Sequence, residues 1–359
     1  MLKVKKFFTG RNVFLFLPLT LSIFGLLMIF EASSVSALRD FGDKFYYFKH
    51  QMVWWFFGIV SFFVFSSLNF RIWRKLALVF FVLTIFFLVL VLIPKIGLTV
   101  YGGRRWISVG LFRFQPAELA KLSLIIYISS LFEKKKGLLP FLAVVGLVLG
   151  LLILEPDLGT AVIIIASVFS IYFISGVSFR QIAGMGVIAA VLSPALILLS
   201  SYRRERFFAF LKSFFSAKES SYHVRQILLA LGTGGFFGRG LGQSKQKFLF
   251  LPEVTTDSIF AIIAEEFGFL GATLIIFLFV YLVVSGFKLA VSSKDPFGQM
   301  LTVGIITCVG VQASINFASM VTLIPLTGVP LPFISYGGSS LLITLSGMGI
   351  IYNISKQQR

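Results

Sequence analysis

The sequence predicts an all-α polytopic membrane protein with ten transmembrane helices. Hydrophobic residues make up 57% of the chain, charged residues only 13%, and the mean hydropathy is +0.96. A soluble domain needs far more charge on its surface. Trp and Tyr residues gather near the ends of apolar runs, as at Trp54, Trp55 and Trp106, where aromatic rings sit at the depth of lipid headgroups.

Ten apolar runs approach the roughly 20 residues that a helix needs to cross the hydrocarbon core. In chain order they are residues 13–30, 52–69, 76–94, 116–132, 138–154, 160–176, 182–200, 258–287, 299–323 and 338–354. The first run has a basic flank and no small-residue cleavage site, so we expect a retained span. An even number of spans puts both termini on one side of the membrane. Basic residues are more frequent on that side than in the opposite short loops, which predicts cytoplasmic termini.

The net charge of +18 indicates anionic partners. Nucleic acid is excluded as the expected partner because the basic residues are scattered between apolar runs and form no continuous soluble face. Anionic lipid headgroups and phosphorylated lipids fit this pattern better. Cys308 is the only cysteine, so no intramolecular disulfide or cysteine metal cluster can form.

No repeat or linker divides the chain, and we expect one domain over residues 1–359 with a long outer-face loop at about 201–257. Phenylalanines alternate with basic residues over 203–215, a pattern typical of an amphipathic helix at the membrane interface. The glycine-rich stretch 231–243 has no strand before it, so it is not a dinucleotide fingerprint. It is either a re-entrant or surface loop or an anion-binding nest.

Asp257 is the most informative single residue. It lies where the long, basic outer segment meets the apolar run that begins at residue 258. A reacting polar group can meet water and lipid headgroups together at such a junction. The alternative is that Asp257 caps the eighth span, because Asp is favoured at helix N-termini.

Other charged residues are predicted on the outer side. Glu118 and Lys121 lie three residues apart on one face of the fourth span, where charge is costly unless paired or functional. They are either a structural pair or part of the site, and Lys121 is placed to bind a phosphate. Arg104 and Arg105, beside Trp106, suit a pyrophosphate, with a solvated or headgroup-bound pair as the alternative.

Lys245 and Lys247 precede Asp257 and are further candidates for substrate binding. Glu155 and Asp157 flank Pro156 in an outer turn. They are weak candidates for a divalent cation, Mg²⁺ or Mn²⁺, and Asp157 is equally suited to cap the sixth span. The metal site is otherwise unknown.

Glu265 and Glu266 are expected inside the eighth span, and one of them to pack against a polar partner in the bundle. His223, in the predicted loop, is expected at the surface.

The chain resembles the SEDS family of bacterial cell-wall proteins. The resemblance rests on four segments: YGGRRWISVGLFRFQPAELAK at 101–121, EPDLGTA at 155–161, RQILLALGTGGFFGRGLGQSKQKFLFLPEVTTDSIFAIIAEEFG at 225–268 and PLTGVPLPFISYGGSS at 325–340. The stretch GLGQSKQKFLFLPE resembles the FtsW division branch more than the RodA elongation branch. Thr255 and Ser258 depart from the His and Phe that more usually flank the TD pair.

The resemblance implies a glycosyltransferase that polymerises lipid II into peptidoglycan on the outer face of the cytoplasmic membrane. It also implies a class B penicillin-binding protein as partner, within the divisome or elongasome, and a polyprenyl-pyrophosphate-linked glycan as product. In the family the Asp of the TD pair, here Asp257, is regarded as catalytic, and Glu118 and Lys121 match residues required for activity.

This chemistry needs a base for the acceptor hydroxyl, cations for the leaving pyrophosphate and an apolar groove for the polyprenyl chain. We expect an inverting single displacement, because Asp257 is the single candidate acid or base, with no second carboxylate expected nearby as nucleophile, and because the resemblance implies an inverting outcome.

Two other functions remain in view. A lipid II flippase would need ionisable residues along a path through the membrane midplane, and apart from Glu265 and Glu266 the charged residues cluster near the predicted membrane faces. A scaffold that only recruits division proteins would leave Asp257 and the Glu118–Lys121 pair without a role.

Overall fold

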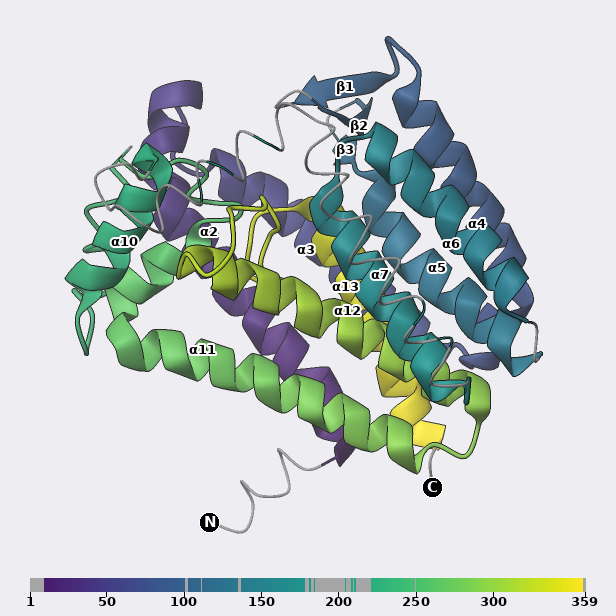
Figure 1. Ribbon diagram of the computed structural model, residues 1–359. Coiled ribbons are helices and arrows are strands. Elements are labelled where there is room, and N and C mark those ends of the chain that lie inside the picture. Colours follow the sequence, from purple (N-terminus) through teal and green to yellow (C-terminus); the bar gives the residue numbers. More distant parts are fainter. Residues whose placement is uncertain are drawn as a thin grey trace.

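The protein is a bundle of helices, seen here in a computed structural model (Figure 1). The structure describes residues 10–177 and 221–357, apart from 101, 102, 111, 135, 136 and 249, and also residues 181, 184, 204, 208 and 210. The helices are η1 (Gly10–Asn12), α2 (Val13–Phe41), α3 (Tyr46–Ser67), α4 (Arg71–Leu92), α5 (Pro116–Glu133), α6 (Leu138–Leu154), α7 (Leu158–Ile174), α10 (Tyr222–Gly234), α11 (Ile259–Ser292), α12 (Pro296–Met320) and α13 (Gly338–Gln357).

The prediction of a helical membrane protein is confirmed, and every expected span except the seventh has a helix at its position. Among the described residues, five helical segments are long and apolar enough to cross a membrane: Gly10–Phe41, Tyr46–Ser67, Arg71–Leu92, Ile259–Ser292 and Pro296–Met320. The expected seventh span, 182–200, and the amphipathic helix at 203–215 lie outside the described residues. The total of ten spans, the position of the long loop and the single domain therefore stay predictions.

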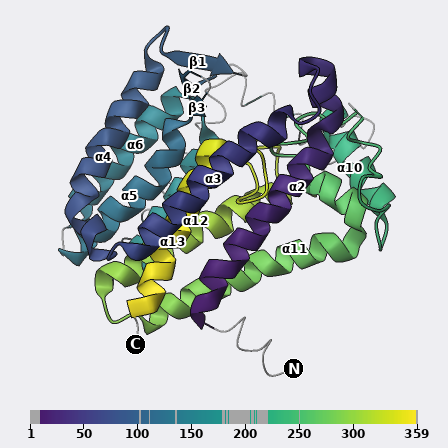
Figure 2. The same cartoon turned by 180° about the vertical axis from the view of Figure 1, so that it is seen from behind.

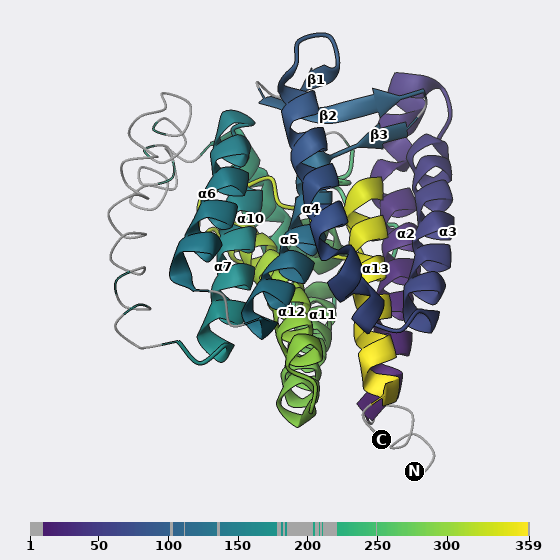
Figure 3. The same ribbon diagram turned by 90° about the vertical axis from the view of Figure 1, so that its right-hand side faces the viewer.

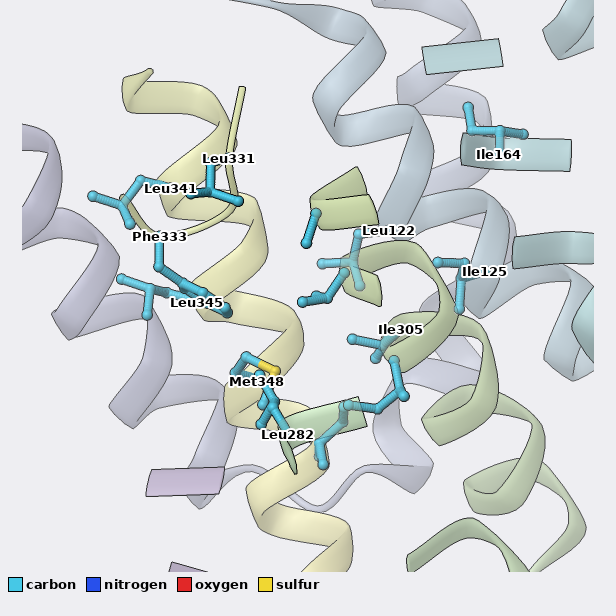
Figure 4. Close-up of a cluster of buried hydrophobic side chains, with 14 of the residues drawn as sticks. Leu122, Ile125, Ile164, Leu282, Ile305, Leu331, Phe333, Leu341, Leu345 and Met348 are labelled. Atoms are coloured by element: carbon cyan, nitrogen blue, oxygen red, sulfur yellow. The ribbon is translucent and has the colours of Figure 1, made fainter. Parts of the chain in front are cut away.

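Helices α5, α12 and α13 form much of the core, and α3 and α4 expose large apolar side chains on the outside of the bundle. Helix α13 packs along α3, and α12 packs against both α11 and α7 (Figures 2 and 3). Leu122 of α5, Ile305 of α12, Leu282 of α11 and Met348 of α13 meet at the centre (Figure 4). Such a bundle places apolar groups both in its core and towards lipid, which explains the high hydropathy of the sequence.

The all-α prediction missed a small antiparallel sheet in the expected outer loop 95–115. Its strands are β1 (Gly97–Val100), β2 (Gly103–Val109) and β3 (Phe112–Phe114), in the order β1-β2-β3. The sheet lies across one end of the bundle, opposite to the start of α2 and the end of α13 (Figure 3). Strand β3 leads within two residues into α5, which begins with Pro116 at a position where proline is favoured.

Helix α11 is broken at Gly268, whose φ of 67° lies in the left-handed region. All residues from Ile259 to Glu266 are buried, whereas the helix after the break exposes many apolar side chains. The segment 235–240, which follows α10, pairs with the backbone groups opened by the break. The peptide nitrogens of Arg239 and Gly240 donate to the carbonyls of Glu265 and Glu266, and those of Phe269 and Leu270 donate to the carbonyls of Gly235 and Phe236.

This pairing decides between the two interpretations of the glycine-rich stretch 231–243. Its first residues end α10, a helix that the sequence had not predicted, and the next ones fill the break in α11. The peptide nitrogens of 238–240 are already bonded to carbonyl groups. The structure therefore favours a re-entrant loop over an anion-binding nest.

We predict that Gly268→Ala greatly lowers the yield of folded protein. A Cβ at residue 268 would lie 2.2 Å from the peptide nitrogen of Gly238, and the left-handed backbone alone costs an L-residue about 1–3 kcal/mol. Gly150→Ala is the matched control, because a Cβ there meets nothing within 4 Å inside α6 and alanine favours a helix. The yield and the melting temperature in detergent are measured for both variants. Equal values for Gly268→Ala and Gly150→Ala would contradict the prediction.

Candidate active site

The candidate catalytic residue Asp257 lies in a tight turn, residues 253–258, directly before α11. The peptide nitrogens of Thr256 and Ser258 both donate to the carbonyl of Glu253, and Glu253 adopts a left-handed φ of 50°. The side chain of Asp257 is only 7% exposed. Ser258 occupies the N-cap position of α11 without a side-chain capping hydrogen bond, and Asp257 lies one residue before it.

Backbone carbonyls of the turn accept hydrogen bonds from distant parts of the chain. The peptide nitrogen of Tyr336 donates to Thr255 O at 2.8 Å. The side-chain amide of Asn316, on α12, donates to Asp257 O at 2.8 Å and to Val329 O at 2.9 Å. Asn316 is fully buried, and its amide therefore fixes the turn to the loop that precedes α13.

A second carboxylate lies close to Asp257, contrary to the sequence-based expectation. Thr256 Oγ1 is 2.9 Å from Glu253 Oε2 and 3.2 Å from Asp257 Oδ1. A hydroxyl has one proton and donates to one of these acceptors at a time.

Aromatic side chains and one arginine adjoin the turn. The rings of Tyr47 and Tyr336 meet edge to face with centroids 5.3 Å apart. Burial, followed by the neighbouring Tyr47 and Tyr46 phenols, raises the pKa of Tyr336 to about 12, although Arg113 acts in the opposite direction. The phenol therefore keeps its proton at neutral pH and can donate a hydrogen bond. Sequence reasoning missed Tyr336, Asn316 and Glu253 as site residues, although the FISYGG and LPE segments were singled out.

The predicted pair on α5 is formed. Lys121 Nζ lies 2.8 Å from Glu118 Oε2, and both side chains are about 95% buried, with exposures of 4% and 5%. The same ammonium donates to Gln312 Oε1 of α12 at 2.7 Å. Pairing explains how two charges are tolerated inside the bundle. The role of Lys121 in binding a phosphate stays a prediction.

Arg104 and Arg105 differ in their surroundings. Arg104 is exposed and lines a pocket of about 320 Å³ with Leu92, Thr99, Leu154 and Pro156. The guanidinium of Arg105 instead donates to the carbonyls of Glu155, at 3.0 Å, and Pro156, at 2.5 Å. Of the two, Arg104 is therefore the one open to an anionic ligand, and Arg105 fixes the turn between α6 and α7.

Lys245 and Lys247 also differ. Lys247 is buried and its ammonium lies 3.2 Å from Glu31 Oε2 and 3.3 Å from Glu266 Oε1, so binding substrate would require this ion pair to break. Lys245 contributes its peptide nitrogen to Glu265 Oε1 at 3.1 Å. The substrate roles of both lysines stay predictions.

The outer turn at Glu155 and Asp157 does not fit a cation. Asp157 caps α7 by accepting from Thr160 N, and it also accepts from Gln115 Nε2. Neither oxygen of the fully buried Glu155 has a hydrogen-bond partner. Burial and the nearby Asp157 raise the pKa of Glu155 to about 8, against the effect of Arg105, and a metal ligand must be deprotonated. In the described part of the chain no three His, Cys, Asp or Glu side chains gather to hold a metal.

The fold and the site define a class of protein: a polytopic helical membrane protein with a buried aspartate turn at one end of the bundle. The chain matches the model of the cell cycle protein family FTSW_RODA_SPOVE over residues 11–359. It belongs to this family, which confirms the resemblance seen in the sequence.

Individual relatives agree with this assignment. The chain is 37% identical to a probable peptidoglycan glycosyltransferase FtsW of Geobacter sp. (strain M18), with 97% of each chain covered, and 37% identical to the stage V sporulation protein E of Bacillus subtilis, with 96% of each covered. Among solved structures it is similar to the rod shape determining protein RodA of Thermus thermophilus, with a TM-score of 0.71, 27% identity and 96% of each chain covered. A chain from a peptidoglycan synthase complex matches with a TM-score of 0.77 and 27% identity, over 96% of this chain and 97% of that one.

We predict that Glu118→Ala and Lys121→Ala each lower the yield of folded protein, because each leaves a buried charge without its partner. The double variant should recover the yield. If Lys121 also holds a phosphate of the substrate, the double variant stays inactive. The test measures the detergent-stable yield and the lipid II polymerisation of the three variants. A fully active double variant would show that the pair is purely structural.

A pH-dependent stability is expected from Glu155. Its pKa of about 8 in the folded protein exceeds the ordinary value of 4.5, so the folded chain binds this proton more tightly than the unfolded chain. Stability therefore falls as the pH rises from about 4.5 to about 8. Glu155→Gln removes this titration, and its melting temperature in detergent should rise relative to that of the wild type between pH 5 and pH 9. If the melting temperatures of the wild type and of Glu155→Gln change in parallel with pH, the raised pKa of Glu155 is disproved.

Proposed function

We propose that the protein polymerises lipid II into peptidoglycan glycan strands on the outer face of the bacterial cytoplasmic membrane, with both termini in the cytoplasm. The observation that carries this proposal is the buried turn around Asp257, held at the same end of the bundle as the sheet and the start of α5. Ser339 Oγ of α13 connects α13 to the end of β3 and the start of α5. It accepts from Gln115 N at 3.2 Å and donates to Arg113 O at 3.4 Å.

Asp257 is proposed as the base that takes the proton of the acceptor hydroxyl while the hydroxyl oxygen attacks the anomeric carbon of the donor. The bond from that carbon to the lipid pyrophosphate breaks, and the pyrophosphate leaves with the electron pair. Arg113 and Arg104 are exposed cations at this end of the bundle and suit the leaving group. Thr256 Oγ1 donates its one proton either to Glu253 Oε2 or to Asp257 Oδ1.

An inverting single displacement remains the proposed stereochemical course, now on different grounds. Glu253 provides the second carboxylate that a double displacement would need. Glu253 Oε2 nevertheless shares the hydroxyl of Thr256 with Asp257, which favours a role in adjusting the base over a role as a separate nucleophile.

A divalent cation, Mg²⁺ or Mn²⁺, is proposed as a cofactor at Glu253 and Asp257. These are hard oxygen ligands of the kind such ions prefer, and they lie together at the turn. A bound cation would offset the charge of the leaving pyrophosphate.

The flippase alternative is less well supported. The acids inside the eighth span, Glu265 and Glu266, would have to carry ions or protons along a path. Glu265 instead accepts from the peptide nitrogens of Lys245 and Gln246 and from Ser244 Oγ, and Glu266 pairs with Lys247. These contacts hold both acids in a structural network with the segment 244–247.

A class B penicillin-binding protein is proposed as the partner, with divisome or elongasome proteins around it. The similarity to a chain from a peptidoglycan synthase complex supports a partner protein. In this proposal the identity of the partner determines whether the protein acts in cell division or in cell elongation.

We predict that Asp257→Asn leaves the protein folded but lowers lipid II polymerisation to the background, because the amide keeps the shape and loses the proton acceptor. The purified protein is assayed with and without a class B penicillin-binding protein. Asp43→Asn is the matched control, since Asp43 lies in an exposed turn and pairs with Lys49. A wild-type rate for Asp257→Asn would show that the base is another residue.

A further inference from the structure

The turn 253–258 has a side-chain anchor in addition to its two backbone anchors. His223 Nε2, on α10, lies 2.8 Å from Ser258 Oγ. Ser258 is fully buried and follows Asp257 directly in the chain. His223 was expected at the surface, but it is partly buried and faces the turn, so that expectation is wrong.

Helix α10 is a suitable support because both of its ends are fixed to α11. At its C-terminal end, Gly234 approaches α11 so closely that a Cβ would lie 2.1 Å from Ala264 O. At its N-terminal end, Ser221 caps the helix by accepting from Val224 N, and His223 reaches Ser258 one residue before α11 begins. Figure 1 shows α10 beside the first part of α11, and the two helices pack together. The histidine therefore projects from a helix with little freedom to move.

We propose that His223 is a positioning residue for the reaction at Asp257, acting through its hydrogen bond to Ser258 Oγ. This proposal rests on the proposed function. The other two anchors hold the carbonyls of Thr255 and Asp257. They fix where the turn lies, whereas the His223–Ser258 bond holds the residue that separates Asp257 from the first turn of α11.

A defined position matters because a displacement of about 1 Å can reduce a catalysed rate about 100-fold. Removing the His223 bond leaves the anchors from Tyr336 and Asn316 in place, so the protein should fold and still bind substrate. The expected effect is a lower kcat with little change in KM.

The experiment compares His223→Ala, Ser258→Ala, the double variant and His223→Gln, with Asp257→Asn assayed in parallel. Each alanine variant should lower kcat for lipid II polymerisation about 10- to 100-fold and leave KM and detergent-stable yield close to wild type. The double variant should be no slower than either single variant, because both remove the same bond. His223→Gln should restore much of the rate, since its amide can donate to Ser258 Oγ. His50→Ala is the matched control, because the His50 ring bonds to Tyr46 O within its own helix.

Several outcomes would overturn the proposal. Wild-type kcat in either alanine variant, independent losses that add in the double variant, or loss of folded protein in both single variants would each do so. If these occur while Asp257→Asn is inactive, the proposed function stands and only the positioning role falls. An active Asp257→Asn, or a wild-type protein that does not polymerise lipid II, overturns the base assignment and the positioning role together.

Discussion

The break in α11 at Gly268 is the constraint on which the rest of the site depends. A helix that bends sharply inside a membrane protein opens backbone groups that lipid cannot satisfy. Residues 235–240 satisfy four of them, and glycine is required at 238 and 268 because any Cβ would strike the opposing backbone. The break also separates the fully buried segment 259–266 from the remainder of α11, which exposes many apolar side chains. The turn with Asp257 therefore begins a helix that is held within the protein.

The two acids just before the break complete this arrangement. Glu265 accepts from the peptide nitrogens of Lys245 and Gln246. Glu266 accepts from the peptide nitrogen of Ser244 and shares the ammonium of Lys247 with Glu31 of α2. Hydrogen bonds and ion pairs of this kind offset the cost of burying a carboxylate. Their partners thus fix the segment that leads from the re-entrant loop to the turn with Asp257, and this role explains acids at a depth where a transport path would otherwise be inferred.

Much of the fold could be predicted because apolar runs of spanning length have one physical meaning, and α2, α3, α4 and α12 lie where such runs predicted them. Helix α10 could not, since it packs against the distant α11. The sheet at 97–114 was missed because its short strands pair within a single loop between two spans. Asp257 was found through its place at a polar–apolar junction. Asn316 and Tyr336 were missed because their roles come from hydrogen bonds between distant parts of the chain. Glu253 is a local partner, three residues before Thr256 in the same turn, and was overlooked. The departure at Ser258 had no evident meaning in the sequence, and His223 now supplies its partner.

The Glu118–Lys121 pair is connected to the turn with Asp257 through α12. Lys121 donates to Gln312 Oε1, and the Gln312 amide donates in turn to Pro330 O at 2.9 Å. One helical turn further along α12, Asn316 donates to Val329 O and to Asp257 O. Both amides thus hold the same short loop, and one of them also holds the turn. A charged pair can therefore influence Asp257 without touching substrate, because a shift of α12 at Gln312 moves Asn316 with it.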